Sequence, residues 1–284
     1  MVEARIVINR ILLLPEEMKK RYNIAEIPSP VIVDGTEYRE DAVPFPLEEF
    51  SAMLLSGKHT IETAASAPME YAAVFKETDP EVPIFVFCLS TKISAFYKSA
   101  VSAAEEAGGK NVHVIDTRVC PPAPTLAALA AAEAARECEN EEELVKRVEE
   151  IVKGVKLYWA LFSLEYLHQT GRISGARAFL GKMLKIVPLI TTDQEGFIVP
   201  AGKTRRLENS LDRITEFIDK DLREKAGSTL DVLIAYTGRE DNARMLEEKV
   251  KERFEVRRSF FFKGGYSTHR YVGPDAAGVA YIVS

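Results

Sequence analysis

The chain has 284 residues, of which 46% are hydrophobic and 28% are charged. Such a composition excludes a disordered chain, a collagen-like repeat and a small disulfide-stabilised fold, and the length suits about two domains. Because 37 Lys and Arg face 43 Asp and Glu, the formal net charge is −6, which disfavours a nucleic-acid-binding protein without excluding a local basic patch.

The first half of the chain alternates between strand and helix patterns. The apolar runs at 84–89 and 112–115 are typical of strands buried on both faces. Asp34-Gly35 predicts a tight turn after a short strand. Strands are expected at 5–8, 32–33, 84–89 and 112–115, and helices at 15–22, 46–55, 70–76, 94–106, 124–136 and 141–152. This order predicts an α/β domain over residues 1–156, with a parallel sheet flanked by helices.

The second half has a different pattern, in which hairpins are mixed with helices. Strands are expected at 157–162, 186–191, 197–199, 232–236, 255–262 and 278–283, and helices at 163–168, 177–184, 207–225 and 241–252. A Gln194-Glu195-Gly196 turn joins two of these strands into a hairpin. The pattern predicts a C-terminal α+β domain over residues 157–284, with a mainly antiparallel sheet.

The cysteines and the N-terminus bear on the cellular compartment. Cys88, Cys120 and Cys138 make an odd number and form no C-x-x-C motif, which favours a reducing compartment. The N-terminus lacks the order of a signal peptide, and no run of about 18 apolar residues is present. We therefore expect a cytoplasmic protein without a transmembrane segment.

Several motifs of common enzymes are missing from the sequence. Neither G-x-G-x-x-G nor G-x-x-x-x-G-K-[ST] occurs, so a dinucleotide or P-loop nucleotide site is unsupported. H-E-x-x-H, paired C-x-x-C and the EF-hand loop are also missing, and we expect no metal site and no cofactor.

Hydroxyl side chains follow several of the predicted strands. Ser90 and Ser94 come after the run at 84–89, Thr117 follows 112–115, and Thr63 lies in a separate polar loop. Ligands of open α/β sheets bind outside the carboxyl ends of the strands, and Ser94 also stands at a helix start, where backbone N–H groups attract anions. Each of these residues can equally be a helix cap or a turn former. Together they favour a small anion site.

These segments resemble, in order, those of the DegV family of fatty-acid-binding proteins. The most specific piece is LEYLHQTGRIS at 164–174, which is similar to the family's L-x-Y-L-x-x-G-G-R-I-S segment. Further similar segments are TAASAPMEY at 63–71, LSTKISAFYKSA at 89–100, VIDTR at 114–118, GFIVPAGKTRR at 196–206 and YVGPDAAGVAY at 271–281. The chain departs from the family pattern at several positions: Asn9-Arg10 replace Asp-Ser, Ala95-Phe96 replace Gly-Thr, and Tyr271 stands where the family has a histidine.

The resemblance implies a two-domain protein that is not an enzyme. It implies that a long-chain fatty acid lies in a tunnel between the domains, where its carboxylate is presented to a separate fatty acid kinase. The matching carboxylate ligands are Thr63 and Ser94, with Tyr271 or the nearby His269 in the place of the family's histidine. Arg172, Lys203 and Arg205 are candidates for contact with the partner or with an acyl phosphate. Candidate tunnel-lining residues are Phe85, Phe87, Leu167, Phe179, Leu180, Met183, Leu184, Ile186 and Leu189.

Other functions remain open from the sequence. The same fold can bind another lipid or amphiphile, because the alanines near the head-group segment change its shape. An enzyme that acts on a phosphorylated small molecule through Arg172, Lys203 and Arg205 is a second alternative, and a protein that only binds other proteins is a third.

Overall fold

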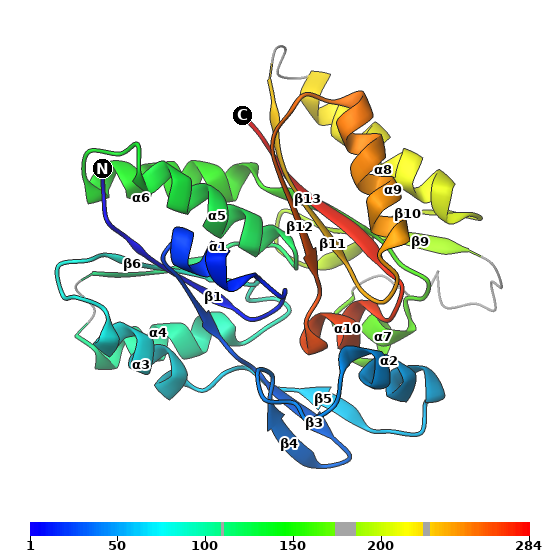
Figure 1. The fold of residues 1–284 in the computed structure, drawn as a ribbon, viewed down its shortest axis with the longest axis horizontal. Helices are drawn as coiled ribbons and strands as arrows, with labels where there is room; N and C mark the ends of the chain where they lie inside the picture. The colour runs from blue at the N-terminus through cyan, green and yellow to red at the C-terminus, as the bar shows by residue number, and fades with distance from the viewer. Residues whose placement is uncertain (109–110, 174–185, 224–227) are drawn as a thin grey trace.

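The computed structural model describes residues 1–108, 111–173, 186–223 and 228–284. The helix predicted at 177–184 therefore lies outside the described residues. The described chain forms a four-stranded sheet, a six-stranded sheet and a three-stranded sheet, arranged with helices as Figure 1 shows.

The four-stranded sheet is built by the first half of the chain and is entirely parallel. Its order is β2 (Ile24–Ile27), β1 (Arg5–Asn9), β6 (Ile84–Cys88) and β7 (Val112–Asp116). Helices α3 (Pro68–Glu77) and α4 (Phe96–Glu106) lie against one face, and α5 (Ala123–Ala135) lies against the other. Short α1 (Glu16–Arg21) precedes β2. The predicted parallel sheet with flanking helices is confirmed.

The strand β7 differs from the sequence-based expectation. Its apolar run predicts a strand buried on both faces, but β7 is an edge strand and all five of its residues are only partly buried. The neighbouring β6, which has a partner on each side, is buried at all five positions. An apolar run does not distinguish a central strand from an edge strand, because the strand order is a tertiary property.

The six-stranded sheet is mainly antiparallel, as predicted for the second half. Its order is β10 (Ile198–Thr204), β9 (Val187–Thr192), β8 (Lys156–Ala160), β13 (Ala277–Val283), β11 (Leu230–Tyr236) and β12 (Val256–Lys263). Only the pair β11 and β12 is parallel. Helices α8 (Leu207–Arg223) and α9 (Asp241–Arg253) pack on one face through an apolar cluster that includes Leu211 and Leu246.

A three-stranded antiparallel sheet forms a separate small unit that the sequence did not predict. It contains β4 (Thr36–Arg39), β3 (Pro30–Val33) and β5 (Ile61–Thr63), with α2 (Leu47–Ser56) beside it. The predicted turn joins β3 to β4, and Asp34 and Gly35 both have positive φ, as a two-residue hairpin turn requires.

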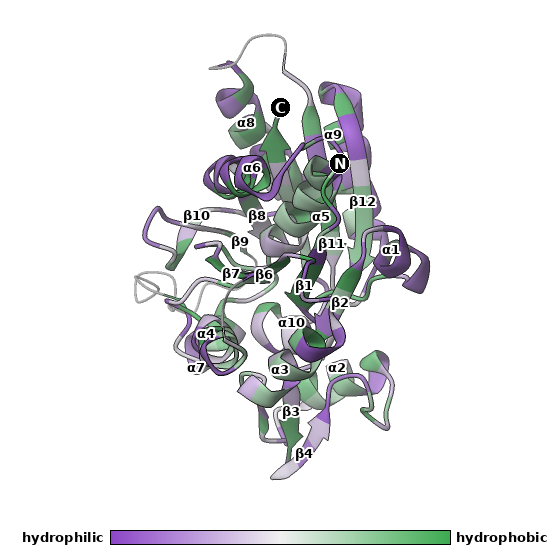
Figure 2. Cartoon of the chain, turned by 90° about the vertical axis from the view of Figure 1, so that its left-hand side faces the viewer, coloured by the Kyte–Doolittle hydropathy of each residue, from purple (hydrophilic) through white to green (hydrophobic). Residues whose placement is uncertain are grey.

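Helix α5 lies between the two large sheets. It contacts β1 and β6 on one side and β13 and β11 on the other, and Figure 2 shows it as an apolar segment among the strands. All of its residues except Glu133 are buried, and its many alanines allow both sheets to approach closely. It also packs closely against the next helix, α6 (Glu141–Gly154).

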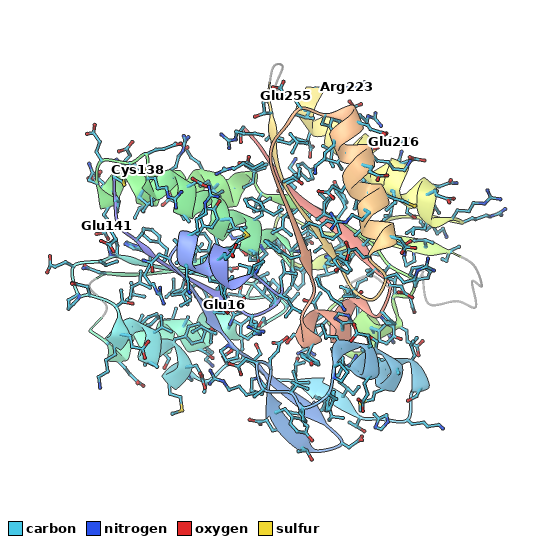
Figure 3. All side chains as sticks on the ribbon, viewed as in Figure 1. Glu16, Cys138, Glu141, Glu216, Arg223 and Glu255 are labelled. Carbon is cyan, nitrogen blue, oxygen red and sulfur yellow. The ribbon has the colours of Figure 1, made fainter. Side chains whose placement is uncertain are left out.

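The other long helices have one polar side. On α8, Leu211, Ile214 and Ile218 face the sheet, while Glu216 and Arg223 are exposed. Figure 3 shows these last two at the periphery of the molecule.

Helix α6 is preceded by the N-cap residue Asn140, whose side chain accepts a hydrogen bond from the Glu143 N–H.

The short helix α10 (Tyr266–Val272) connects the two halves and was not predicted. Four of its side chains bond to the first half: the Tyr266 hydroxyl donates to the Phe45 carbonyl at 2.6 Å, Thr268 donates to the Ile11 carbonyl, Arg270 donates to the Ile61 carbonyl at 2.6 Å, and Tyr271 meets Thr63. A fifth contact comes from the buried Glu40, whose carboxylate accepts hydrogen bonds from the Ser267 N–H and hydroxyl, both at 2.9 Å.

The predicted division at residue 156 remains a proposal. The six-stranded sheet begins with β8 at Lys156, which supports the proposed boundary between residues 1–156 and 157–284. Within the described ranges, no helix combines the length and the apolar character needed to cross a bilayer.

The burial of Glu40 generates a prediction about stability. Burial raises the pKa of Glu40 to about 7, against the opposing effect of the hydrogen bonds from Ser267. Because the folded pKa lies above that of an unfolded glutamate, the protonated carboxyl stabilises the fold at low pH, and this contribution is lost as the pH rises toward about 7. We expect Glu40→Gln to remove this loss. Between low and neutral pH, the free energies of unfolding of wild type and variant should therefore diverge by up to about 3 kcal/mol.

Urea unfolding of both proteins across this pH range measures the effect. Glu37→Gln, on the exposed side of β4, is the control and should follow wild type. Parallel pH profiles for wild type and Glu40→Gln would contradict the prediction.

Candidate binding site

A mostly apolar cavity of about 240 Å³ lies where the two halves meet. The first half contributes Ile11 from the loop after β1, the end of β5 with its loop, the loop after β6 with the start of α4, and the segment before α5. The second half contributes residues of β8, α7 (Glu165–Gln169), β9, β10 and α10. The described lining residues are Ile11, Thr63, Ala64, Ala65, Leu89, Ile93, Ser94, Ala95, Phe96, Cys120, Pro121, Trp159, Leu167, Arg172, Ile190, Ile198, Ser267, Thr268, Tyr271 and Val272.

The structure brings Thr63, Ser94, Tyr271 and Arg172 to this one cavity. Thr63 ends β5, and its hydroxyl lies 2.5 Å from the Tyr271 hydroxyl on α10. Ser94 follows β6 and precedes α4, where its hydroxyl accepts a hydrogen bond of 3.3 Å from the Phe96 N–H. The cavity therefore gathers these three hydroxyl groups next to an apolar interior, besides those of Ser267 and Thr268, which donate to Glu40 and to the Ile11 carbonyl.

The other strand-end hydroxyls have structural roles. Ser90 and Thr117 are buried, and neither is among the described residues that line this 240 Å³ cavity. The Ser90 hydroxyl accepts from the Lys92 N–H at 3.1 Å, and Thr117 donates to the Cys88 carbonyl at 2.7 Å. Ser90 therefore stabilises a turn, and Thr117 links the end of β7 to β6, so neither hydroxyl faces this cavity.

The placement of His269 does not fit its predicted role. His269 is fully buried, and the described lining includes Tyr271 but not His269. Its Nδ1 lies 2.9 Å from the Gly265 carbonyl, to which it donates, and its Nε2 accepts from the Gly238 N–H at 3.3 Å. Burial lowers the pKa of His269 to about 4, so the ring is neutral near pH 7 and holds α10 in place.

The predicted basic residues separate into two locations. Arg172 lines the cavity, and its guanidinium lies 5.4 Å from the centre of the Tyr271 ring, within range of a cation–π interaction. Arg172 also donates to the Thr170 carbonyl. Lys203 and Arg205 are exposed at the far end of β10, roughly 16 Å along the strand from the cavity residue Ile198. They do not form one edge with Arg172.

Few of the predicted tunnel-lining residues fall on the cavity. Leu167 lines it, whereas Phe85, Phe87 and Leu189 are buried in the core, and Ile186 is partly buried away from the described lining. Phe179, Leu180, Met183 and Leu184 lie outside the described residues.

Sequence reasoning missed a second group of lining residues, Cys120, Pro121 and Trp159. The Trp159 indole N–H donates to the Pro121 carbonyl at 2.6 Å. A Cβ on Gly278 would lie 2.4 Å from the indole ring, so glycine is required there. Burial raises the pKa of Cys120 to about 12, and the thiol is protonated and unreactive at neutral pH. The only sequence feature that pointed to this group of lining residues was Trp159, the single tryptophan of the chain, in a predicted apolar strand.

Comparison with known proteins places these features in a family. Residues 4–284 match the family model described as "Uncharacterised protein, DegV family". The chain belongs to the DegV family. It is 28% identical over 285 residues to the DegV domain-containing protein TTE1491 of Caldanaerobacter subterraneus subsp. tengcongensis, with 99% of each chain covered.

Solved structures of DegV proteins share the fold over their whole length. A DegV family protein from Thermus thermophilus, described by its fatty acid binding, superposes with a TM-score of 0.89 at 23% identity and full coverage of both chains. DegV from Bacillus subtilis, described as a fatty acid binding protein, gives a TM-score of 0.81 at 25% identity, again with full coverage.

The neutral state of His269 predicts how binding depends on pH. The affinity for a long-chain fatty acid should show no step near pH ~6.5 that arises from His269, although this is the range in which an ordinary histidine titrates. His269→Asn, which keeps a hydrogen-bond donor toward Gly265, should give the same profile. Calorimetric titrations at several pH values measure it, and a step that is present in wild type and lost in the variant would restore a ligand role for His269.

Proposed function

We propose that this DegV family protein binds a long-chain fatty acid, with the carboxylate held by Thr63 and Ser94 and the acyl chain in the apolar space between the two halves. The observation that carries the proposal is the convergence of these hydroxyls, Tyr271 and Arg172 on one apolar cavity between the halves. The relatives described as fatty-acid-binding proteins support it.

The chemistry of the lining fits an anionic head and an apolar chain. A carboxylate buried without partners is costly, and hydroxyl donors with a nearby guanidinium offset that cost. Each buried methylene contributes about 0.8 kcal/mol, so a chain of about fifteen carbons gains roughly 12 kcal/mol before the cost of association. The apolar surface therefore supplies affinity, and the hydroxyls set the orientation of the head group.

We further propose that the protein acts as a carrier rather than as an enzyme. The family resemblance implies that a separate fatty acid kinase phosphorylates the presented carboxylate. Arg172 would contact the head group or the acyl phosphate, because it lines the cavity, and Lys203 and Arg205 would contact the kinase on the exposed end of β10. We place this exchange in the cytoplasm, which agrees with three free buried cysteines.

The first prediction tests the head-group ligands. Thr63→Val combined with Ser94→Ala should weaken fatty acid binding by about 1.5–3 kcal/mol for each charge-assisted hydrogen bond lost. Thr60→Val combined with Ser102→Ala removes two hydroxyls outside the described lining and should leave affinity unchanged. Calorimetry gives the affinities, and equal affinities for both double variants would contradict the assignment of Thr63 and Ser94 as head-group ligands.

The second prediction tests whether this protein only carries the fatty acid and a separate kinase phosphorylates it. The protein with fatty acid and ATP-Mg²⁺ should form no acyl phosphate alone, and should form it when a bacterial fatty acid kinase is added. Lys203→Ala and Arg205→Ala should retain lipid binding and lose turnover with the kinase. Arg172→Ala should also lose turnover, and it should weaken lipid binding because it removes the guanidinium beside the head group. Acyl phosphate made by this protein alone would overturn the carrier function, and full turnover with all three variants would remove the proposed kinase contacts.

A further inference from the structure

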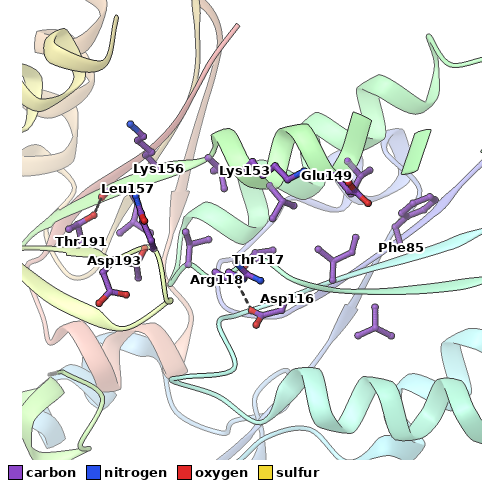
Figure 4. A pocket seen from close by; sticks show the side chains of 18 of the residues that line it. Phe85, Asp116, Thr117, Arg118, Glu149, Lys153, Lys156, Leu157, Thr191 and Asp193 are labelled. Carbon is purple, nitrogen blue, oxygen red and sulfur yellow. Dashed lines mark hydrogen bonds and ion pairs between the residues drawn. The ribbon is translucent and has the colours of Figure 1, made fainter. Parts of the chain in front are cut away.

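A second and larger cavity, of about 1010 Å³, lies along β7 and shares no described lining residue with the first. Figure 4 shows part of its lining, with Asp116 of β7, Glu149 and Lys153 of α6, Leu157 of β8 and Thr191 of β9. We call it the β7 groove. Its described lining comprises Phe85, residues 113–119, Val145, Val148, Glu149, Val152, Lys153, residues 155–158 and residues 191–194.

The backbone of β7 itself forms one wall. Seven consecutive residues, 113–119, line the groove. Since side chains alternate between the two faces of a strand, an unbroken run means that the edge of the strand faces the cavity. This is the edge left unpaired by the strand order.

The hydrogen bonds to β6 show which backbone groups point into the groove. The Ile84 N–H donates to the Asn111 carbonyl, and the Thr117 N–H donates to the Cys88 carbonyl. Odd-numbered residues of β7 therefore face β6, and the N–H and C=O groups of Val112, Val114 and Asp116 point away from it. Within the part of the chain that the structure describes, no group bonds to these backbone atoms.

The remaining walls combine apolar side chains with charged residues, of which Arg118 is exposed. Helix α6 contributes Val145, Val148 and Val152. Lys153 lies 3.5 Å from Glu149, and Lys156 lies 2.9 Å from Asp221. The Asp116 carboxylate accepts hydrogen bonds from the Thr91 hydroxyl and the Arg118 N–H, at 2.8 and 3.0 Å. Among the described residues, the groove therefore contains a row of unpaired backbone donors and acceptors along β7, beside the apolar side chains of α6.

We propose that the β7 groove binds an extended, mainly apolar segment of a partner protein, which adds as a strand to the free edge of β7. An added strand uses the unpaired N–H and C=O groups, and its alternate side chains contact the valines of α6. A second copy of this chain is a poorer occupant, because α6 and the β8–β9 region flank the edge and obstruct the approach of another sheet. The proposal does not depend on fatty acid binding.

The test uses a random library of linear peptides, about twelve residues long, displayed on phage and selected against the whole protein. Enriched peptides are expected to carry alternating apolar residues. Val114→Pro removes one N–H that faces the groove while leaving the bonds of β7 to β6 intact, and Pro is tolerated on edge strands. We expect at least a tenfold loss of peptide affinity in this variant, with fatty acid affinity unchanged.

A second pair of variants separates groove binding from an effect on folding. Val145→Glu places a charge in the apolar wall and should also weaken peptide binding tenfold, whereas Lys146→Glu, on the exposed side of the same helix, should not. Hydrogen exchange should show the Val114 amide slowed by the bound peptide. The proposal is overturned if the selection yields no binding peptide, if the peptides bind all variants equally, or if a fatty acid alone protects the Val114 amide.

Discussion

The packing of α5 between two sheets is the constraint on which the rest of the structure depends. A helix that is buried on nearly every side has no polar face, and its side chains must be small if two sheets are to reach it. Nearly all of α5 is buried, and most of it is alanine. Cys120 and Pro121, which precede the N-cap residue Pro122, form part of the cavity wall. The element that joins the sheets therefore also fixes one side of the binding site.

The cavity is completed from the opposite direction by α10. This helix follows β12 of the second half, yet its side chains bond to β5 and to the loops around β1 and α2. Tyr271 therefore reaches Thr63 across more than two hundred residues of sequence. The site exists only in the assembled pair of halves, because each half contributes part of the described lining.

Much of the fold could be predicted because the alternation of apolar runs and helices is a local property. The parallel sheet and the antiparallel sheet follow from it, and the turn at Asp34-Gly35 follows from the Asp-Gly pair itself. The edge position of β7 and the helix α10 could not be predicted, since the first depends on strand order and the second is a seven-residue helix without apolar periodicity. Thr63 and Ser94 were found from strand ends and resemblance, but the same reasoning also selected Ser90 and Thr117. Only the tertiary structure shows which hydroxyls face the cavity.

Trp159 gives the site an optical property. It is the only tryptophan in the chain and it lines the smaller cavity. Gly278 lies against its ring, and the Pro121 carbonyl accepts a hydrogen bond from its N–H. Indole fluorescence responds to the polarity and mobility of its surroundings, and here every tryptophan photon originates at the cavity wall. The emission of the unlabelled protein is therefore a direct readout of whether that space contains water or an acyl chain.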